Sequence, residues 1–92
     1  MKTTKSFDKQ YSILDSKIKI SFKNRLELFK ASPFDARLRN HSLKGKYFGY
    51  RSINITGDVR ALYAIRGNMI IIFGFVGSRS QLYISVDIET LD

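Results

Sequence analysis

The segment NHSLKGKYFGYRSINITGDVRALY, residues 40–63, contains the residue types that cleavage of RNA needs. It holds the single histidine of the chain, His41, together with arginines, lysines and tyrosines. Cleavage through the 2′-hydroxyl of RNA requires a group that removes the hydroxyl proton, a cation that stabilises the dianionic phosphorane, and an acid for the departing 5′ oxygen. Arginine and tyrosine can take the last two roles, and no metal ion is required. The segment therefore favours RNA, whose phosphates bind cations and whose splayed bases stack on aromatic rings.

Other common chemistries lack their residues in this chain. With one histidine, no cysteine and no pair of carboxylates at ligand spacing, the sequence predicts no metal site and no cofactor. A serine triad fails because the sequence has no second candidate histidine and no nucleophile motif. Gly45, Gly49 and Gly57 are spaced for turns and do not form the phosphate-binding pattern GxxxxGK[ST].

The charge of the chain is the strongest compositional signal. Sixteen basic residues against eight acidic ones give a net charge of +8 over 92 residues. Such an excess predicts a polyanionic partner, which can be nucleic acid, an anionic membrane or an acidic protein. Most basic residues precede Arg79, whereas residues 87–92 hold Asp87, Glu89 and Asp92, so we expect a basic body and a short acidic tail.

The composition also bears on the compartment. The chain has no cysteine and no charged-then-apolar leader, which predicts a cytoplasmic protein without a secretory signal. The longest apolar run, residues 69–76, is much shorter than the ~20 residues that a membrane-spanning helix needs. We therefore expect no contact with a membrane.

Two amphipathic helices are predicted in the first third of the chain. The first begins at a Ser6 cap and ends near Asp15. The second begins at Asp15 or Ser16 and is stopped by Pro33. Their apolar stripes are formed by Phe7, Tyr11 and Leu14 in the first helix and by Ile18, Phe22, Leu26 and Phe29 in the second. Two consecutive helices with a tight joint predict a helical hairpin that packs on another layer.

The second half of the chain predicts that layer as a sheet. Strands are expected at residues 48–56, Val59–Ile65 and Met69–Val76, with turns at Gly57 and Gly67, and the third of them is expected to be central and most buried. Residues 81–86 could add a strand, and residues 1–5 could form an edge strand.

These elements predict an α+β domain over residues 1–86, followed by the tail at 87–92. The helical hairpin covers one face of a twisted, mainly antiparallel sheet of about four strands, and Ile53 and Ile55 point toward the helices. The other face of the sheet is expected to be open and to carry polar and basic groups.

Four short motifs occur in a fixed order in the segments HSLKG, YFGYRSINITGDVRALY and FGFVGSRSQLY. They are similar, in the same order, to the motifs H-x-L-x-G, G-Y-R, D-x-R-x-x-Y and G-x-H-x-x-L-[FY]. These motifs are those of the RelE superfamily of bacterial toxins, and the chain most closely resembles its YafQ-like branch. The resemblance extends over residues 7–83. It implies a RelE-like fold, cleavage of mRNA on the ribosome, and neutralisation by a small antitoxin.

The resemblance also implies roles for single residues. His41 and Asp58 match active-site positions of the YafQ-like branch, Arg60 matches a phosphate-contacting arginine of RelE-type toxins, and Tyr83 matches the aromatic residue that positions or protonates the substrate. Arg79 stands where the branch carries its late histidine, and with Arg60 and Tyr83 it resembles the histidine-free set of RelE. The predicted catalytic residues are His41, Asp58, Arg60, Arg79 and Tyr83, and the predicted RNA-binding residues are Lys44, Lys46 and Arg51.

Several alternatives stay open on the sequence. The proton acceptor can be His41 or a lysine. Ser52 and Asn54 occupy positions where the YafQ-like branch carries an acid and a histidine, so the chain can also be an impaired member that only binds RNA and its antitoxin. A third reading is a ParE-like toxin that inhibits DNA gyrase by protein contact, although the histidine-containing HSLKG motif argues against it. The expected partners are an acidic antitoxin, the ribosome and mRNA.

Overall fold

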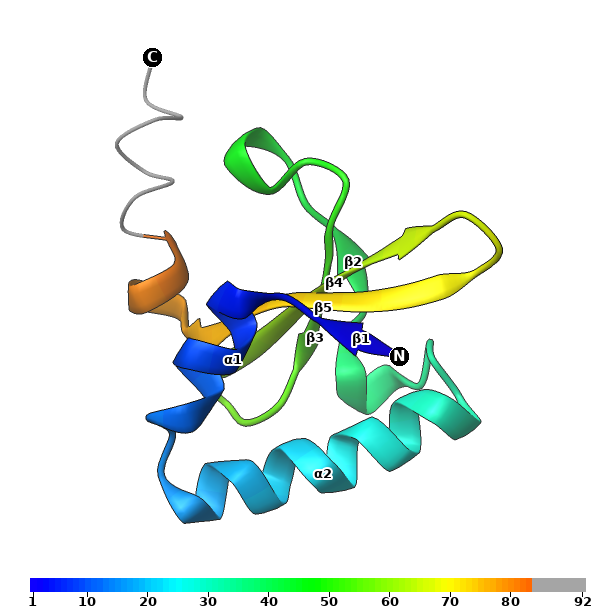
Figure 1. Cartoon of the computed structure of the whole chain (residues 1–92). Coiled ribbons are helices and arrows are strands. Elements are labelled where there is room, and N and C mark those ends of the chain that lie inside the picture. Colours follow the sequence, from blue (N-terminus) through cyan, green and yellow to red (C-terminus); the bar gives the residue numbers. More distant parts are fainter. Residues whose placement is uncertain (84–92) are drawn as a thin grey trace.

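Two helices follow a short first strand, and most of the remaining chain forms one sheet (Figure 1). The computed structural model describes residues 1–83. The elements are β1 (Lys2–Thr3), α1 (Lys5–Ser12), α2 (Ser16–Ala31), η1 (Ala36–Leu38), β2 (His41–Ser42), η2 (Gly45–Tyr47), β3 (Arg51–Asn54), β4 (Val59–Arg66) and β5 (Ile70–Ser78), where η denotes a 3-10 helix. Residues 79–83, which follow β5, are helical; they are called the helix at 79–83 below.

The sheet has five strands in the order β1-β5-β4-β3-β2. All neighbouring pairs are antiparallel except β1 and β5, which run parallel. The predicted α+β class, the edge strand near the N-terminus and the antiparallel character are confirmed. The count of about four strands was one too low, because β2 is only two residues long and too short to give a period-two pattern.

The prediction that residues 69–76 form the central strand was wrong. β4 is the middle strand, and its residues 61–64 are buried. Met69 lies in the turn before β5, with φ 67° and a side chain that is 76% exposed. The hairpin of β4 and β5 extends beyond the body of the domain (Figure 1), so the start of β5 is not covered on both sides.

The caps of the two helices decide where they start. α1 is capped by Thr4, whose hydroxyl accepts a hydrogen bond from the Phe7 N–H at 3.1 Å. The predicted cap at Ser6 was wrong, since Ser6 already lies inside the helix. α2 begins after Asp15, whose carboxylate accepts from the Lys17 N–H at 3.1 Å, as predicted.

No helix within residues 1–83 is long and apolar enough to cross a membrane.

The main hydrophobic core lies between the helical hairpin and one face of the sheet. In Figure 1, α2 extends along this face. Phe73 is at the centre of the core, with ring centroids of Phe7 and Phe22 at 5.8 Å and of Phe29 at 5.9 Å. Ile53 and Ile55 belong to the same cluster, which confirms that they face the helices.

The opposite face of the sheet carries a second, smaller core. The prediction that this face is open was therefore wrong. Tyr47, Leu62 and Leu82 are buried there, and the rings of Tyr50 and Phe75 pack against them. The segment around η2 and the helix at 79–83 supply part of this cluster, and both lie on the side away from α2 (Figure 1). The aromatic residues at 47, 50 and 75 therefore form a cluster on this face of the sheet.

Two predicted strands differ from the structure. The strand expected at 48–56 is limited to 51–54. It starts late because Gly49 has φ 94°, a value that glycine adopts and an extended strand does not. Residues 81–83, expected in a strand, are helical. The Ser78 hydroxyl accepts from the Gln81 N–H at 3.1 Å, and the Gln81 side chain accepts from the Ser78 N–H at 2.9 Å. This capping box, S-x-x-Q, starts a helix instead.

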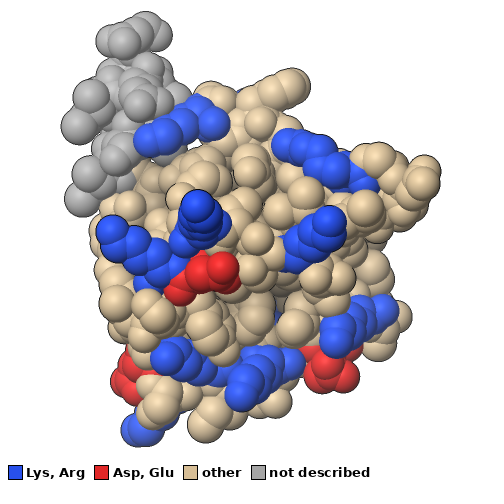
Figure 2. Space-filling model, in the orientation of Figure 1, with Lys and Arg blue, Asp and Glu red and all other residues tan. Residues whose placement is uncertain are grey.

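The predicted domain boundary at 86 and the acidic tail at 87–92 lie outside the described residues. Over the part of the chain that the structure does describe, the positive charge is widely distributed. Figure 2 shows Lys and Arg side chains scattered over the visible face, with few Asp and Glu side chains among them.

Candidate active site

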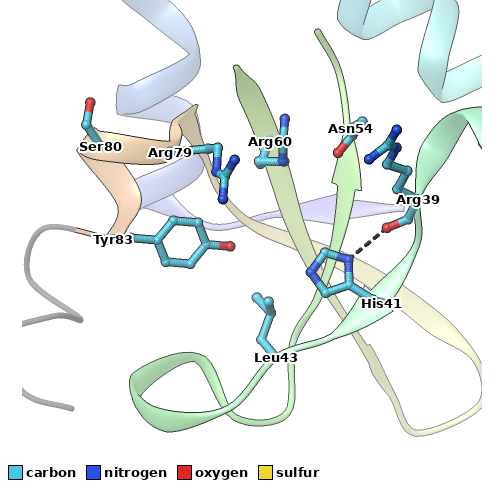
Figure 3. Close-up of a pocket in the computed structure, with 8 residues that line it drawn as sticks. All are labelled: Arg39, His41, Leu43, Asn54, Arg60, Arg79, Ser80 and Tyr83. Atoms are coloured by element: carbon cyan, nitrogen blue, oxygen red, sulfur yellow. Dashed lines mark hydrogen bonds between the residues drawn. The ribbon is translucent and has the colours of Figure 1, made fainter. Parts of the chain in front are cut away.

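A cavity of about 860 Å³ opens on the sheet face opposite α2. Its lining residues are Arg39, His41, Leu43, Asn54, Arg60, Arg79, Ser80 and Tyr83. They come from β2 and its flanks, from β3 and β4, and from the helix at 79–83 (Figure 3). Three of the eight are arginines and none is an aspartate or glutamate, so the charge of the lining favours an anion.

His41 is oriented by a main-chain carbonyl. Its Nδ1 lies 2.8 Å from the carbonyl oxygen of Arg39. A carbonyl oxygen only accepts, so Nδ1 carries the proton and, in the neutral ring, Nε2 is an acceptor. Figure 3 shows that Nε2 points into the cavity, toward Tyr83. The acceptor nitrogen of the neutral His41 ring therefore faces the cavity.

A hydrogen-bonded network holds the segment before His41. The Asn40 amide donates to the carbonyl oxygen of Pro33 at 2.9 Å and to the buried hydroxyl of Tyr63 at 2.7 Å. The Asn40 amide oxygen accepts from Nε of Arg51 at 2.8 Å. These bonds tie the segment to β3 and β4, so they fix the place of His41 relative to the sheet.

Arg51, predicted to bind RNA, lies outside the cavity. It is on the same side of β3 as Ile53, the side of the helices, because alternate residues of a strand share a face. Its guanidinium carbon is 5.3 Å from the centroid of the Phe34 ring, in a cation–π contact. Arg51 therefore supports the segment that carries His41.

Arg60 reaches the cavity from β4. One terminal nitrogen of its guanidinium donates to the carbonyl oxygens of Thr56 and Gly57, at 3.1 and 3.2 Å. These bonds fix the side chain over the turn between β3 and β4. An arginine has five N–H donors, so others remain for a phosphate.

Arg79 and Tyr83 are brought to the cavity by the helix at 79–83. Besides the capping box at its start, this helix is held by the Tyr47 hydroxyl, which donates to the carbonyl oxygen of Leu82 at 3.0 Å. The rings of Tyr47 and Tyr83 meet edge to face, with centroids 6.1 Å apart. Figure 3 shows the Tyr83 hydroxyl and the Arg79 guanidinium directed toward the middle of the cavity.

The other predicted site residues are placed around the cavity and do not line it. Asp58 is exposed in the turn before β4, where its main-chain carbonyl accepts from the Arg79 N–H at 3.1 Å. Lys44 and Lys46 are exposed on the segment around η2. Within residues 1–83, no three His, Cys, Asp or Glu side chains form a group that could hold a metal ion.

Four lining residues were not among the predicted site residues: Arg39, Leu43, Asn54 and Ser80. Leu43 lies two positions after His41, so a period-two reading around the histidine was a signal for it. Arg39 is the left-handed residue at the end of η1, and no local pattern indicated its place. Ser80 follows from the capping box, which turns residues 79–83 into a helix.

Ser52 is fully buried on β3, and its hydroxyl has no hydrogen-bond partner among the described residues. An unpaired buried hydroxyl is destabilising. We expect that Ser52→Ala leaves the free energy of unfolding unchanged or raises it by about 1 kcal/mol. Because Ser52 does not line the cavity, the RNA cleavage that the resemblance implies should stay within about twofold of the parent. Urea denaturation and an RNA-cleavage assay check these two expectations. A clear loss of stability would show that the hydroxyl is hydrogen-bonded.

The fold is that of the RelE-like toxins. Among solved structures, YafQ from E. coli superposes with a TM-score of 0.75 at 19% identity, covering 89% of this chain and 94% of that one. The RelB-RelE antitoxin–toxin complex from Methanococcus jannaschii gives a TM-score of 0.70 at 25% identity, over 90% and 95% of the chains. A copper-bound mutant toxin from Helicobacter pylori gives 0.65 at 29% identity, over 88% and 94%.

The family model for the bacterial toxin of the type II toxin–antitoxin system, YafQ, matches residues 1–84. The chain therefore belongs to the YafQ toxin family, and it is a toxin of a type II toxin–antitoxin system. This confirms the resemblance that the four motifs indicated. A comparison with curated protein sequences found no match.

Proposed function

We propose that this toxin is a metal-independent endoribonuclease that cleaves mRNA on the ribosome in the cytoplasm and so blocks translation. One observation carries the proposal. Nε2 of His41, an acceptor in the neutral ring, points into a cavity that is lined by three arginines and a tyrosine and by no carboxylate. This set of groups matches a phosphodiester that is attacked by its own 2′-hydroxyl.

The groups divide the reaction as follows. Nε2 of His41 takes the proton of the 2′-hydroxyl while the 2′ oxygen forms a bond to phosphorus. Arg60 and Arg79 donate hydrogen bonds to the non-bridging oxygens, whose negative charge grows in the phosphorane. The bond from phosphorus to the 5′ oxygen then breaks, and the Tyr83 hydroxyl gives that oxygen a proton. The products are a 2′,3′-cyclic phosphate and a free 5′-hydroxyl.

The remaining predicted residues have supporting parts in this proposal. Lys44 and Lys46, on the exposed segment around η2, attract the phosphates of the RNA at longer range. Asp58 holds the start of the helix at 79–83 through its carbonyl, and Arg51 steadies the segment before His41 through Asn40.

The partner that neutralises the toxin is proposed to be an acidic antitoxin. RelE from Methanococcus jannaschii was solved in complex with the antitoxin RelB. In the present chain the net charge of +8 and the arginine-lined cavity favour an acidic segment that covers the cavity. Co-expression with the product of an adjacent gene for a short acidic protein should yield a stable complex and restore growth.

Induced expression in bacterial cells tests the function. Growth should stop, and mRNA should be cut within coding regions while ribosomes remain assembled. Growth arrest with intact mRNA and signs of DNA damage would instead indicate a ParE-like inhibitor of gyrase. Tight binding to an antitoxin without toxicity would indicate an impaired member of the family.

Arg79→Ala should lower the rate of RNA cleavage by about 10²- to 10³-fold, because it removes a donor to the charge that develops on phosphorus. Within residues 1–83 no side chain hydrogen-bonds the Arg79 guanidinium, so the fold should tolerate its loss. Arg66→Ala is the matched control, since it removes the same charge from an exposed site at the far end of β4. If both variants keep parental activity, Arg79 has no part in the reaction.

A further inference from the structure

Arg39 takes part in the cavity in two separate ways. Its backbone is left-handed, with φ 47° and ψ 45°, at the end of η1. Its carbonyl oxygen accepts the hydrogen bond from Nδ1 of His41. Its guanidinium lines the same cavity, and no hydrogen bond or ion pair holds it to another of the described residues.

The side chain of Arg39 lies apart from the other two arginines. Figure 3 shows Arg79, Arg60, Asn54 and Arg39 in a row across the cavity. Arg79 and Arg60 are toward the Tyr83 end, whereas Arg39 is at the opposite end, above His41 and beside Asn54. In the proposed reaction, Arg60 and Arg79 bind the phosphate that is cleaved, and Tyr83 protonates its leaving oxygen. Arg39 is at the other end of the row, so this phosphate does not neutralise its charge.

A row of like charges is unfavourable unless a polyanion extends along it. Single-stranded RNA presents one phosphate per nucleotide, so a strand that places one phosphate between Arg60 and Arg79 carries the next one along the row. We propose that Arg39 binds the phosphate adjacent to the cleaved one and thereby sets the direction in which the RNA strand crosses the cavity. This inference rests on the proposed function, which supplies RNA as the ligand.

The salt dependence of binding tests the inference. A short single-stranded RNA with 2′-O-methyl groups at every position is the probe, because it lacks the attacking hydroxyl and is not cleaved. Its affinity is measured by fluorescence anisotropy at several salt concentrations. Each phosphate contact on a single strand contributes about 0.7 to the slope of log K against log salt. Arg39→Ala should reduce the magnitude of the slope by about 0.7, and Arg39→Lys should restore it.

Arg66→Ala is the matched control and should leave the slope unchanged, because Arg66 is exposed at the tip of β4, away from the cavity. An Arg39→Ala slope equal to that of the parent would overturn the inference. The same loss in the Arg66→Ala variant would also overturn it, since the effect would then be one of net charge.

A second variant separates the side chain from the backbone. Asparagine tolerates the left-handed conformation of residue 39 better than alanine does, so Arg39→Asn should keep the carbonyl in place. His41 is the only histidine, so its NMR signals are assigned without ambiguity. The Nδ1–H tautomer should persist in Arg39→Asn while the slope falls. A lost tautomer would place the effect on His41 and overturn the inference.

The probe is bound and never cleaved, so the result does not depend on activity. An Arg39-dependent slope in a chain that cuts no RNA supports the subsite and contradicts the proposed function alone. A chain that cuts RNA with a slope indifferent to residue 39 contradicts the subsite alone.

Discussion

His41→Ala is expected to lower the rate of RNA cleavage by about 10²- to 10⁴-fold, the usual contribution of a positioned general base. Arg39 holds Nδ1–H of His41, so only Nε2 can accept the proton of the 2′-hydroxyl. Binding of an uncleavable RNA should change little, because phosphate contacts come from the arginines. The two measurements together, a large loss of rate with retained affinity, would place His41 in the chemical step.

Chemical rescue gives an independent readout of the same residue. Added imidazole should restore part of the rate of His41→Ala, because it supplies the proton acceptor that the variant lacks.

The control for β2 itself is Ser42→Ala. Ser42 is the neighbouring exposed residue of the same two-residue strand, and its side chain points to the other face. It should retain parental activity. If His41→Ala cleaves RNA as fast as the parent, a lysine or another group is the base.

Phe73→Ala is expected to have the largest effect on stability. Phe73 is 2% exposed, and its ring meets Phe7, Phe22, Phe29 and Tyr63 with centroids 5.8 to 5.9 Å apart. Truncation of such a residue removes buried apolar surface and leaves a cavity, at a cost of about 3–5 kcal/mol. A small domain has a free energy of unfolding of about 5–15 kcal/mol, so this variant should lose a large part of its stability.

Urea denaturation measures the loss, and Phe48→Ala is the matched control. Phe48 is 81% exposed, so its truncation should change the free energy of unfolding by less than about 0.5 kcal/mol. A loss of under about 1 kcal/mol for Phe73→Ala would mean that the helices are not held by this cluster.

Local patterns predicted the elements that have several turns or a long alternation. The helices over 5–12 and 16–31 and the strand from Val59 follow from apolar periodicity, because each buries one face of its own. The helix at 79–83 was predictable too, from Ser78 and Gln81 at capping-box spacing, although the β-branched residues that follow suggested a strand.

The site shows where such patterns stop. The alternation of β3 places Arg51 with Ile53 on the helix side, and the structure confirms this placement, so its basic character alone was a poor guide to a place in the cavity. Arg39, in contrast, lines the cavity although no pattern predicted it. Nothing in its local sequence indicates that a left-handed residue at the end of η1 directs its carbonyl to His41 and its side chain into the cavity.

The sequence by itself determined the residue types for RNA chemistry, the positive charge, the helical hairpin, the two long strands and the family. The tertiary structure alone decided which side chains meet. The lining residues, which lie between positions 39 and 83, reach one cavity only because β4 pairs with β3 and β5 in a fixed register and Tyr47 holds the helix at 79–83 through Leu82. These contacts join residues far apart in the chain, and the free energy that selects them comes from burial of the whole core, which no local pattern contains.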